Sequence, residues 1–180
     1  MSYTGDTSRD PRLGLDDGPR PHAYDPVTQP EYFEGVLTRR MLAFLVDAIM
    51  IVGAVVLFYL CVLVMGVVTF GLSWIAFFFI WPTFVIVALA YNALTLGSPA
   101  SATLGMRLME LEMRTWYGAP AYSLLGAVHA VCFWVSVSVF TPFVLLVALF
   151  NDRRRLLHDF LVGTVVVNNE VRAGALRRPR

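Results

Sequence analysis

The sequence predicts an all-α membrane protein with three hydrophobic segments and a small strand element outside the bilayer. Hydrophobic residues make up 57% of the 180-residue chain and charged residues only 15%, whereas soluble domains average about 25% charged residues. The charges are also segregated, because no Asp, Glu, Lys or Arg lies between Asp47 and Arg107 or between Arg114 and Asp152. Each uncharged stretch exceeds the ~20 apolar residues that cross a ~30 Å hydrocarbon core, so the chain must lie in a membrane.

The first two hydrophobic segments have the features of membrane-spanning helices. The first runs from about residue 36 to 70 and is long enough to cross with tilt. The second runs from about residue 74 to 96, with tryptophans near one end and Tyr91 near the other, and such aromatic residues prefer the two membrane interfaces. Pro82 lies in the first turns of this segment, where a proline costs a helix least.

The arginines and the polar ends of the chain predict its domain boundaries and its orientation. Residues 1–35 are rich in proline, glycine and charge, which predicts a disordered tail, and residues 169–180 form a basic C-terminal tail. Residues 36–168 would then form the transmembrane domain. Arg39 and Arg40 precede the first segment, so the positive-inside rule places the N-terminus in the cytoplasm. No aromatic interleaving accompanies the arginines, so we expect lipid headgroups and no nucleic acid as their partners.

The third hydrophobic segment, residues 122–150, has two possible paths. A continuous apolar run is usually one helix, which favours a simple crossing, but this would carry the arginines at 153–155 outside, against the positive-inside rule. Within residues 108–114, Glu110, Glu112 and Arg114 alternate with Leu111 and Met113, and residues 163–167 are mostly β-branched. Both are features of short strands. A lone strand leaves its backbone groups unpaired. If these two strands pair on one side of the membrane, the third segment must be broken or re-entrant.

Asp47 is the polar residue with the strongest indication of a role within the membrane. It follows Arg40 by seven residues, which places it roughly 10 Å deeper on the same helix face. A carboxylate at a helix centre costs about 2.5–3.5 kcal/mol on insertion scales, so Asp47 should be paired or protonated. Two interpretations remain: a structural ion pair with an arginine, for which Arg40 is the first candidate, or a carboxylate that handles protons or cations. Asn92 could donate to Asp47 or bond within its own helix.

The remaining polar residues do not form a recognisable catalytic or metal site in the sequence. His129 has Cys132 one turn further on, but two ligands do not make a metal site, and a buried histidine is the simpler interpretation. His158 and Asp159 follow a basic run, but no nucleophile, oxyanion-hole motif or phosphate loop accompanies them. The sequence therefore predicts no enzyme, no cofactor and no metal site.

Three short motifs nevertheless resemble the RDD family of membrane proteins, which is named for one arginine and two aspartates. The run RMLAFLVD at residues 40–47 is similar to that family's first-helix signature, with its arginine at the helix start and an aspartate within it. The run TLGMRLMEL at residues 103–111 is similar to the family's stretch of glycine and a basic residue before a short apolar run. This similarity makes Gly105 and Arg107 candidate site residues.

The third motif, LHDFLVGTVVV at residues 157–167, resembles the C-terminal block of the family. The resemblance implies that Asp159 is the second aspartate, with Asp152 as the alternative, and it adds His158 as a neighbouring candidate. Many members carry an arginine in the third segment, where His129 is the nearest candidate here. This departure weakens any role that is carried over to that position.

The resemblance covers about residues 36–168 and implies a multi-pass protein of the bacterial inner membrane. The molecular function of the family is mostly unassigned, with cation/proton exchange suggested for some members. We therefore expect a structural, assembly or partner-binding membrane module. The alternative is a subunit of an oligomeric cation/proton exchanger that uses Asp47, because three segments are too few to enclose a pathway. The expected partners are the lipid bilayer, further copies of the chain or other membrane proteins, and in the second case a proton or monovalent cation.

Overall fold

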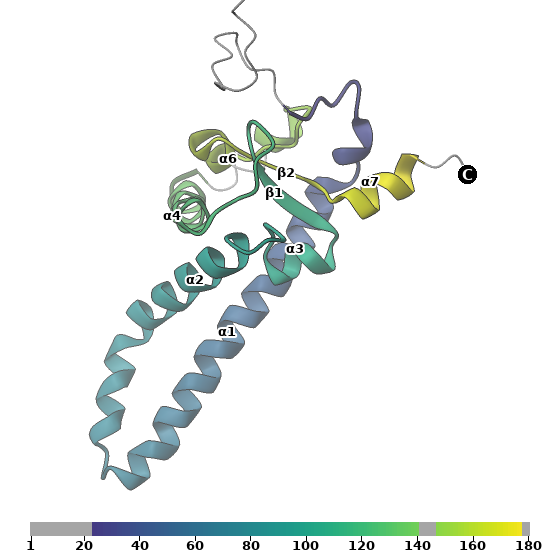
Figure 1. The fold of residues 1–180 in the computed structure, drawn as a ribbon. Coiled ribbons are helices and arrows are strands. Elements are labelled where there is room, and N and C mark those ends of the chain that lie inside the picture. The colour runs from purple at the N-terminus through teal and green to yellow at the C-terminus, as the bar shows by residue number, and fades with distance from the viewer. Residues whose placement is uncertain (1–22, 141–146, 178–180) are drawn as a thin grey trace, which may run out of the picture.

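A long helical hairpin extends from a compact head made of short elements (Figure 1). The structure, a computed structural model, describes residues 23–140 and 147–177. The hairpin consists of α1 (Val36–Val68), the 3-10 helix η3 (Leu72–Phe79) and α2 (Ile80–Leu96). By length and composition, two helical stretches can cross a membrane, one ending with α1 and one formed by η3 and α2. The first two predicted segments are therefore confirmed as helices.

The surface of the hairpin suits lipid rather than water. Its apolar side chains are widely exposed, with Leu57 at 64% and Phe78 at 88%, and lipid is the solvent in which such exposure is stable. A few polar contacts join its two arms. The Tyr59 hydroxyl donates to the Ala76 carbonyl oxygen at 3.1 Å and shares a second hydrogen bond with the Thr83 hydroxyl at 3.0 Å. The predicted class, an all-α membrane protein with a small strand element, is confirmed.

The head collects elements from both ends of the chain around the base of α1. Its largest apolar cluster includes Val36 at the start of α1 and Leu111 and Met113 of the sheet, so the first turn of the hairpin is part of the head's core. In chain order the head contains η2 (Pro30–Tyr32), α3 (Leu104–Leu108), β1 (Leu111–Thr115), α4 (Ser123–Phe140), α6 (Leu157–Val162), β2 (Thr164–Asn168) and α7 (Glu170–Arg177).

The two predicted strands pair with each other. β1 and β2 form a two-stranded antiparallel sheet whose register runs from Leu111 opposite Asn168 to Thr115 opposite Thr164. Every residue of β2 is buried, which agrees with its nearly continuous run of β-branched side chains. The pairing holds the chain segments before and after the third hydrophobic segment side by side, so both lie on one side of the membrane.

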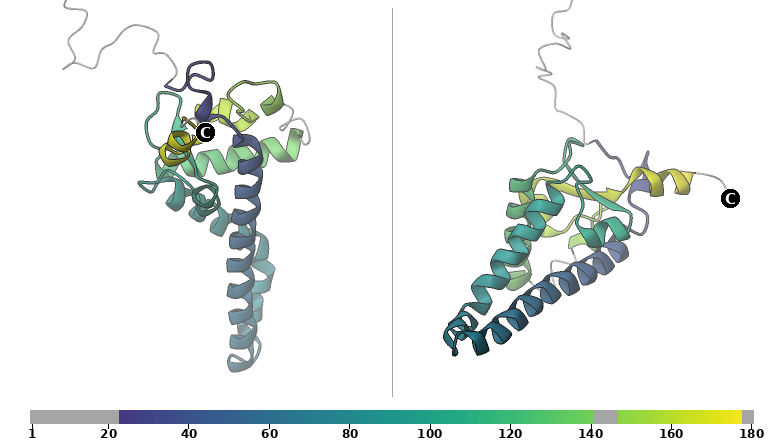
Figure 2. Two further views of the ribbon diagram at one scale, coloured as in Figure 1. Left: turned by 90° about the vertical axis from the view of Figure 1, so that its right-hand side faces the viewer. Right: turned by 60° about the horizontal axis from the view of Figure 1, so that its bottom comes forward.

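The third hydrophobic segment therefore does not cross in a simple way, and the preference for a single crossing is wrong. Its described part is α4, which lies steeply across α1 and not alongside it (Figures 1 and 2). α4 packs mainly on α2. A Cβ at Gly126 would lie 2.9 Å from the Asn92 carbonyl oxygen, so glycine permits this close approach. Residues 141–146 of the segment lie outside the described part of the chain.

The described residues at both ends of the hydrophobic part of the chain are also folded, although their polar composition is typical of tails. Residues 23–35 do not behave as the predicted disordered tail, because Tyr32 and Phe33 are buried in a second apolar cluster that includes Ala173 of α7. The Tyr32 hydroxyl donates to Glu170 across this contact. The segment before α1 thus packs on the head through Tyr32 and Phe33, and the basic C-terminal tail is helical through Arg177. Residues 1–22 lie outside the described residues.

Backbone hydrogen bonds at the two ends of the sheet show which opposite residues of β1 and β2 have the shortest Cα–Cα distances. Trp116 N donates to Gly163 O, and Asn169 N donates to Glu110 O. Because hydrogen-bonded and non-hydrogen-bonded pairs alternate along an antiparallel ladder, the pair Met113–Val166 is non-hydrogen-bonded. The Cα atoms of such pairs lie about 4.5 Å apart, within the range that a disulfide spans.

Cysteines introduced by Met113→Cys and Val166→Cys should therefore form a disulfide on oxidation, with both native cysteines replaced by alanine. The measurement is the mobility shift of the full-length protein after oxidation and after reduction. The control pair is Leu111→Cys with Val165→Cys, which is out of register and should remain reduced. Equal cross-linking of both pairs, or of the control alone, would contradict the register.

Candidate functional site

The candidate residues from the sequence fall into two clusters at the head end of the hairpin. One cluster surrounds a buried ion pair between α1 and α6, and the other surrounds a carboxylate that faces α2 and α3. A third position, within α3, belongs to neither cluster. The first cluster contains Arg40, His129, His158 and Asp159, the second contains Asp47 and Gly105, and Arg107 lies apart.

Asp159 is the centre of the first cluster. Its carboxylate is completely buried and accepts two hydrogen bonds from the Arg40 guanidinium, at 2.6 Å to Oδ2 and 3.2 Å to Oδ1. The backbone N–H of Leu156 also donates to Oδ2, at 2.9 Å, which caps the first turn of α6. Bidentate pairs of arginine and carboxylate are among the strongest charge-assisted contacts. Arg40 thereby joins the base of α1 to α6.

The Arg40 guanidinium keeps Asp159 ionised. Burial alone raises the pKa of the Asp159 carboxyl, but the positive charge and hydrogen bonds of Arg40 outweigh this effect, so the pKa lies well below its usual value. Burial acts in the opposite sense on the imidazoles, lowering the pKa of His129 to about 4 and that of His158 to about 3. Both histidines are therefore neutral near pH 7.

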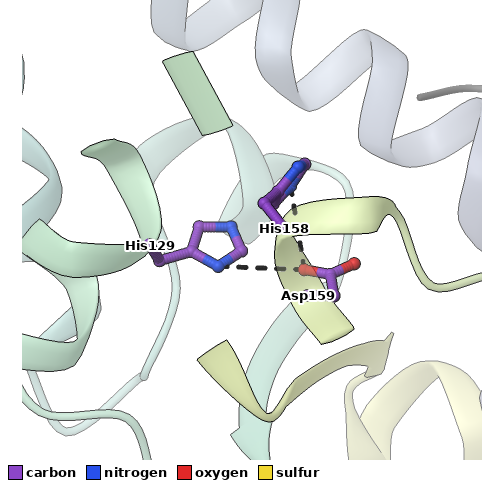
Figure 3. A group of neighbouring side chains, drawn as sticks. All are labelled: His129, His158 and Asp159. Carbon is purple, nitrogen blue, oxygen red and sulfur yellow. Dashed lines mark ion pairs between the residues drawn. The ribbon is translucent and has the colours of Figure 1, made fainter. Parts of the chain in front are cut away.

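The two imidazoles flank the same oxygen of Asp159. Nδ1 of His129 and Nε2 of His158 each lie 3.8 Å from Asp159 Oδ1, and the two rings meet edge to face with their centres 4.8 Å apart. Figure 3 shows His129 reaching the carboxylate from α4 while His158 and Asp159 come from α6. The Ser136 hydroxyl lies 3.3 Å from the other nitrogen of His158, which fixes the orientation of that ring.

Sequence analysis missed one member of this cluster, Arg155. Its guanidinium is buried and donates to the carbonyl oxygens of Thr164, at 2.8 Å, and Asp159, at 2.7 Å. It also lies over the rings of Trp116 and Phe160, at 4.4 and 4.1 Å from their centres. The run of three arginines was interpreted only as an orientation signal. Arg155 instead holds the turn between α6 and β2.

Asp47 is held by neutral donors. Its Oδ1 accepts hydrogen bonds from the Tyr91 hydroxyl at 2.5 Å and from the Gly105 backbone N–H at 2.7 Å. Its Oδ2 accepts a bond from the Thr103 hydroxyl at 2.6 Å, and Thr103 in turn caps α3. A Cβ at Gly105 would lie 2.1 Å from the carbonyl oxygen of Ala43, so only glycine lets α3 approach α1 closely enough to make these bonds.

Three expectations about individual residues need correction. Arg40 is not the partner of Asp47, because its guanidinium pairs with Asp159. Asp159 lies 119 positions later in the chain, and helical spacing does not relate residues so far apart. Asn92 does not donate to Asp47 either, because its amide bonds the Ala88 carbonyl oxygen one turn back in α2. Asp152, the alternative second aspartate, is exposed, so the geometry favours Asp159.

Arg107 has a local role. Its guanidinium donates to the Ala102 carbonyl oxygen at 3.1 Å and to the Ser98 hydroxyl at 2.7 Å. These bonds brace the short connection between α2 and α3. Arg107 therefore supports the segment that carries the donors to Asp47, without touching that carboxylate.

Neutralising one member of the Arg40–Asp159 pair should destabilise the protein more than neutralising both. Either Arg40→Gln or Asp159→Asn leaves a buried charge without its partner, which typically costs about 3–5 kcal/mol. The double variant removes both charges and should recover part of that loss. Thermal unfolding of the four proteins in one detergent measures the coupling.

Arg39→Gln is the matched control, because Arg39 pairs with the partly exposed Glu110 at 3.1 Å. Exposed pairs of this kind contribute about 1 kcal/mol or less. Additive losses at Arg40 and Asp159 would contradict a coupled pair.

The comparisons with known proteins identify the family of the chain. The sequence model of the RDD family matches residues 35–163, a span that contains Arg40, Asp47 and Asp159. Searches of curated proteins and of solved structures find no significant match. Since the matched span covers more than half of the chain, the protein belongs to the RDD family.

Proposed function

We propose that this protein is an assembly or partner-binding module of the membrane, whose hairpin anchors a rigid head. One observation carries the proposal: the two carboxylates of the family-like motifs, Asp47 and Asp159, are both occupied by bonds within the chain. An exchanger needs a carboxylate that is released to bind a proton or a cation in turn. Asp159 is instead sealed by an arginine, and Asp47 by three donors from α2 and the start of α3. These carboxylates fasten the head to the hairpin.

The small number of crossing helices supports the same conclusion. With α4 lying across the hairpin, the described residues contain two helical stretches that can cross a membrane, and two helices cannot surround a pathway. The long exposed apolar faces of α1 and α2 are suited to lipid and to other membrane helices. Function through contact, with further copies of the chain or with other membrane proteins, requires no pathway.

The distribution of arginines supports an orientation with the head in the cytoplasm. Arg39, Arg107 and Arg114, together with the arginines at 153–155, all belong to the head end, whereas the tip at residues 69–73 is uncharged. The return of the chain through β2 removes the conflict that a simple third crossing would create. The positive-inside rule then favours a cytoplasmic head and N-terminal segment, as in a protein of a cell inner membrane.

Cation/proton exchange is the second candidate function. The observation in its favour is the pair of hydroxyl groups, from Tyr91 and Thr103, that face the Asp47 carboxylate. Such hydroxyls can rotate to accept as well as donate hydrogen bonds, so they could accommodate a protonated carboxyl. Exchange would require an oligomer, in which several hairpins line a pathway beside Asp47.

Labelling with a membrane-impermeant thiol reagent tests the orientation. In a protein without native cysteines, Phe70→Cys at the tip should react in intact bacterial cells, because this position is 99% exposed and should face outward. Val27→Cys on the head side is also exposed but should react only after the cells are permeabilised. The reverse pattern would refute the proposed orientation.

Asp47→Asn separates the two candidate functions. The amide retains a carbonyl oxygen for Tyr91 and Gly105, and its NH2 can donate to the Thr103 hydroxyl, so we expect a loss of only about 1–2 kcal/mol of stability. Asp47→Leu removes all three bonds and should destabilise the protein more. Wild-type protein in liposomes should show no cation flux driven by a pH gradient.

The control for the flux assay is Asp152→Asn, which removes an exposed carboxylate. The exchange hypothesis predicts that wild-type and Asp152→Asn proteins carry flux and that a folded Asp47→Asn protein does not. That result would overturn the assembly proposal.

A further inference from the structure

Four polar atoms from three elements converge inside the head. Asp159 Oδ1 faces His129 Nδ1 and His158 Nε2, each at 3.8 Å. The Thr164 hydroxyl at the start of β2 lies 3.4 Å from both Asp159 Oδ1 and His129 Nδ1. The two contacts of the Thr164 hydroxyl are long hydrogen bonds, and the two distances of 3.8 Å lie beyond hydrogen-bond range.

The spacing of the three ligand-type side chains is slightly wider than that of metal ligands. One ligand atom from each of His129, His158 and Asp159 lies within 4.8 Å of the others. Zinc binds imidazole nitrogen and carboxylate oxygen at about 2.0–2.2 Å, so two ligands at roughly tetrahedral angles lie about 3.3–3.6 Å apart. The two distances of 3.8 Å to Asp159 Oδ1 lie slightly above this range, so binding of an ion would draw the three side chains slightly closer together.

The surroundings of the ligands resemble those of metal-bound residues. A metal-binding histidine usually has its second ring nitrogen hydrogen-bonded, which holds the ring in place, and Nδ1 of His158 has the Ser136 hydroxyl at 3.3 Å. Metal-binding carboxylates are likewise held by further hydrogen bonds. Arg40 and the Leu156 N–H hold Oδ2 of Asp159 at 2.6 and 2.9 Å, which leaves Oδ1 turned toward the imidazoles.

We propose that His129, His158 and Asp159 form a binding site for a divalent first-row transition metal. Two imidazole nitrogens and one carboxylate oxygen suit Zn²⁺, Co²⁺, Ni²⁺ and Fe²⁺, whereas Mg²⁺ and Ca²⁺ prefer all-oxygen sites. The bound ion would join α4 to α6, and the Thr164 hydroxyl or a water would complete its coordination. This site goes beyond the assembly function and does not depend on it.

Arg40 would lower the affinity of this site for a metal ion. Its guanidinium contacts Oδ1 more weakly than Oδ2, at 3.2 against 2.6 Å, so it leaves room for an ion on the Oδ1 side but repels a dication by charge. We therefore expect Arg40→Gln to bind metal more tightly than the wild type, although the variant is less stable. A purely structural histidine–aspartate cluster would show no such gain.

Cobalt binding to the full-length protein tests the site. The protein is purified without a histidine tag, stripped with a chelator and titrated with Co²⁺, whose visible absorption reports its ligands, and then with competing Zn²⁺. We expect uptake of one equivalent, and a loss of affinity of tenfold or more in both His129→Gln and His158→Gln. His22→Gln, at a histidine outside the described residues, is the matched control and should bind as the wild type does.

Two results would overturn the proposal. One is a wild-type protein that takes up no Co²⁺ or Zn²⁺, or whose affinity is unchanged in both histidine variants. The other is a thiolate signal in the Co²⁺ spectrum that disappears in Cys132→Ser, since this would place the metal between His129 and Cys132 on α4. Both the uptake and the spectrum are measured on the wild type, so the test stands even where a variant does not fold.

Discussion

The contact between Arg40 and Asp159 joins parts of the chain that lie 119 positions apart, and the rest of the head depends on it. Arg40 sits where α1 leaves the head, and Asp159 lies in α6, just before the strand that returns to the sheet. Because both charges are buried, neither is stable without the other. The pair therefore fixes the entrance of the hairpin against the C-terminal part of the domain, and the sheet, α4 and the histidines take their places around it.

The pairing of β1 with β2 imposes the second constraint. Backbone groups of a short strand near the membrane need partners, and in this chain the partner strand lies beyond the third hydrophobic segment. That segment must return to the side from which it came, so α4 lies across the hairpin and packs on α2. The same return places the arginines at 153–155 beside the other basic residues of the head, in agreement with the positive-inside rule.

Sequence reasoning predicted what depends on composition and local pattern, and it failed where distant side chains meet. Two helices, the strand pair and the choice of Arg40, Asp47 and Asp159 as candidate site residues all follow from periodicity, charge placement and family motifs. The partner of Arg40 could not be derived, because helical spacing relates Arg40 to Asp47 and says nothing about a residue in α6. For the same reason His129 was paired with Cys132 in its own helix, although the fold brings it to His158 and Asp159.

The two aspartates share one mechanical role despite their different partners. Arg40 and Asp47 lie seven residues apart on α1, and each binds a different part of the head: Arg40 binds α6, and Asp47 binds the start of α3 together with Tyr91 of α2. Two attachment points along one helix prevent the head from rotating about the hairpin, which a single point would allow. A buried carboxylate is costly unless it is hydrogen-bonded or paired, and the bonds that attach the hairpin to the head satisfy both aspartates.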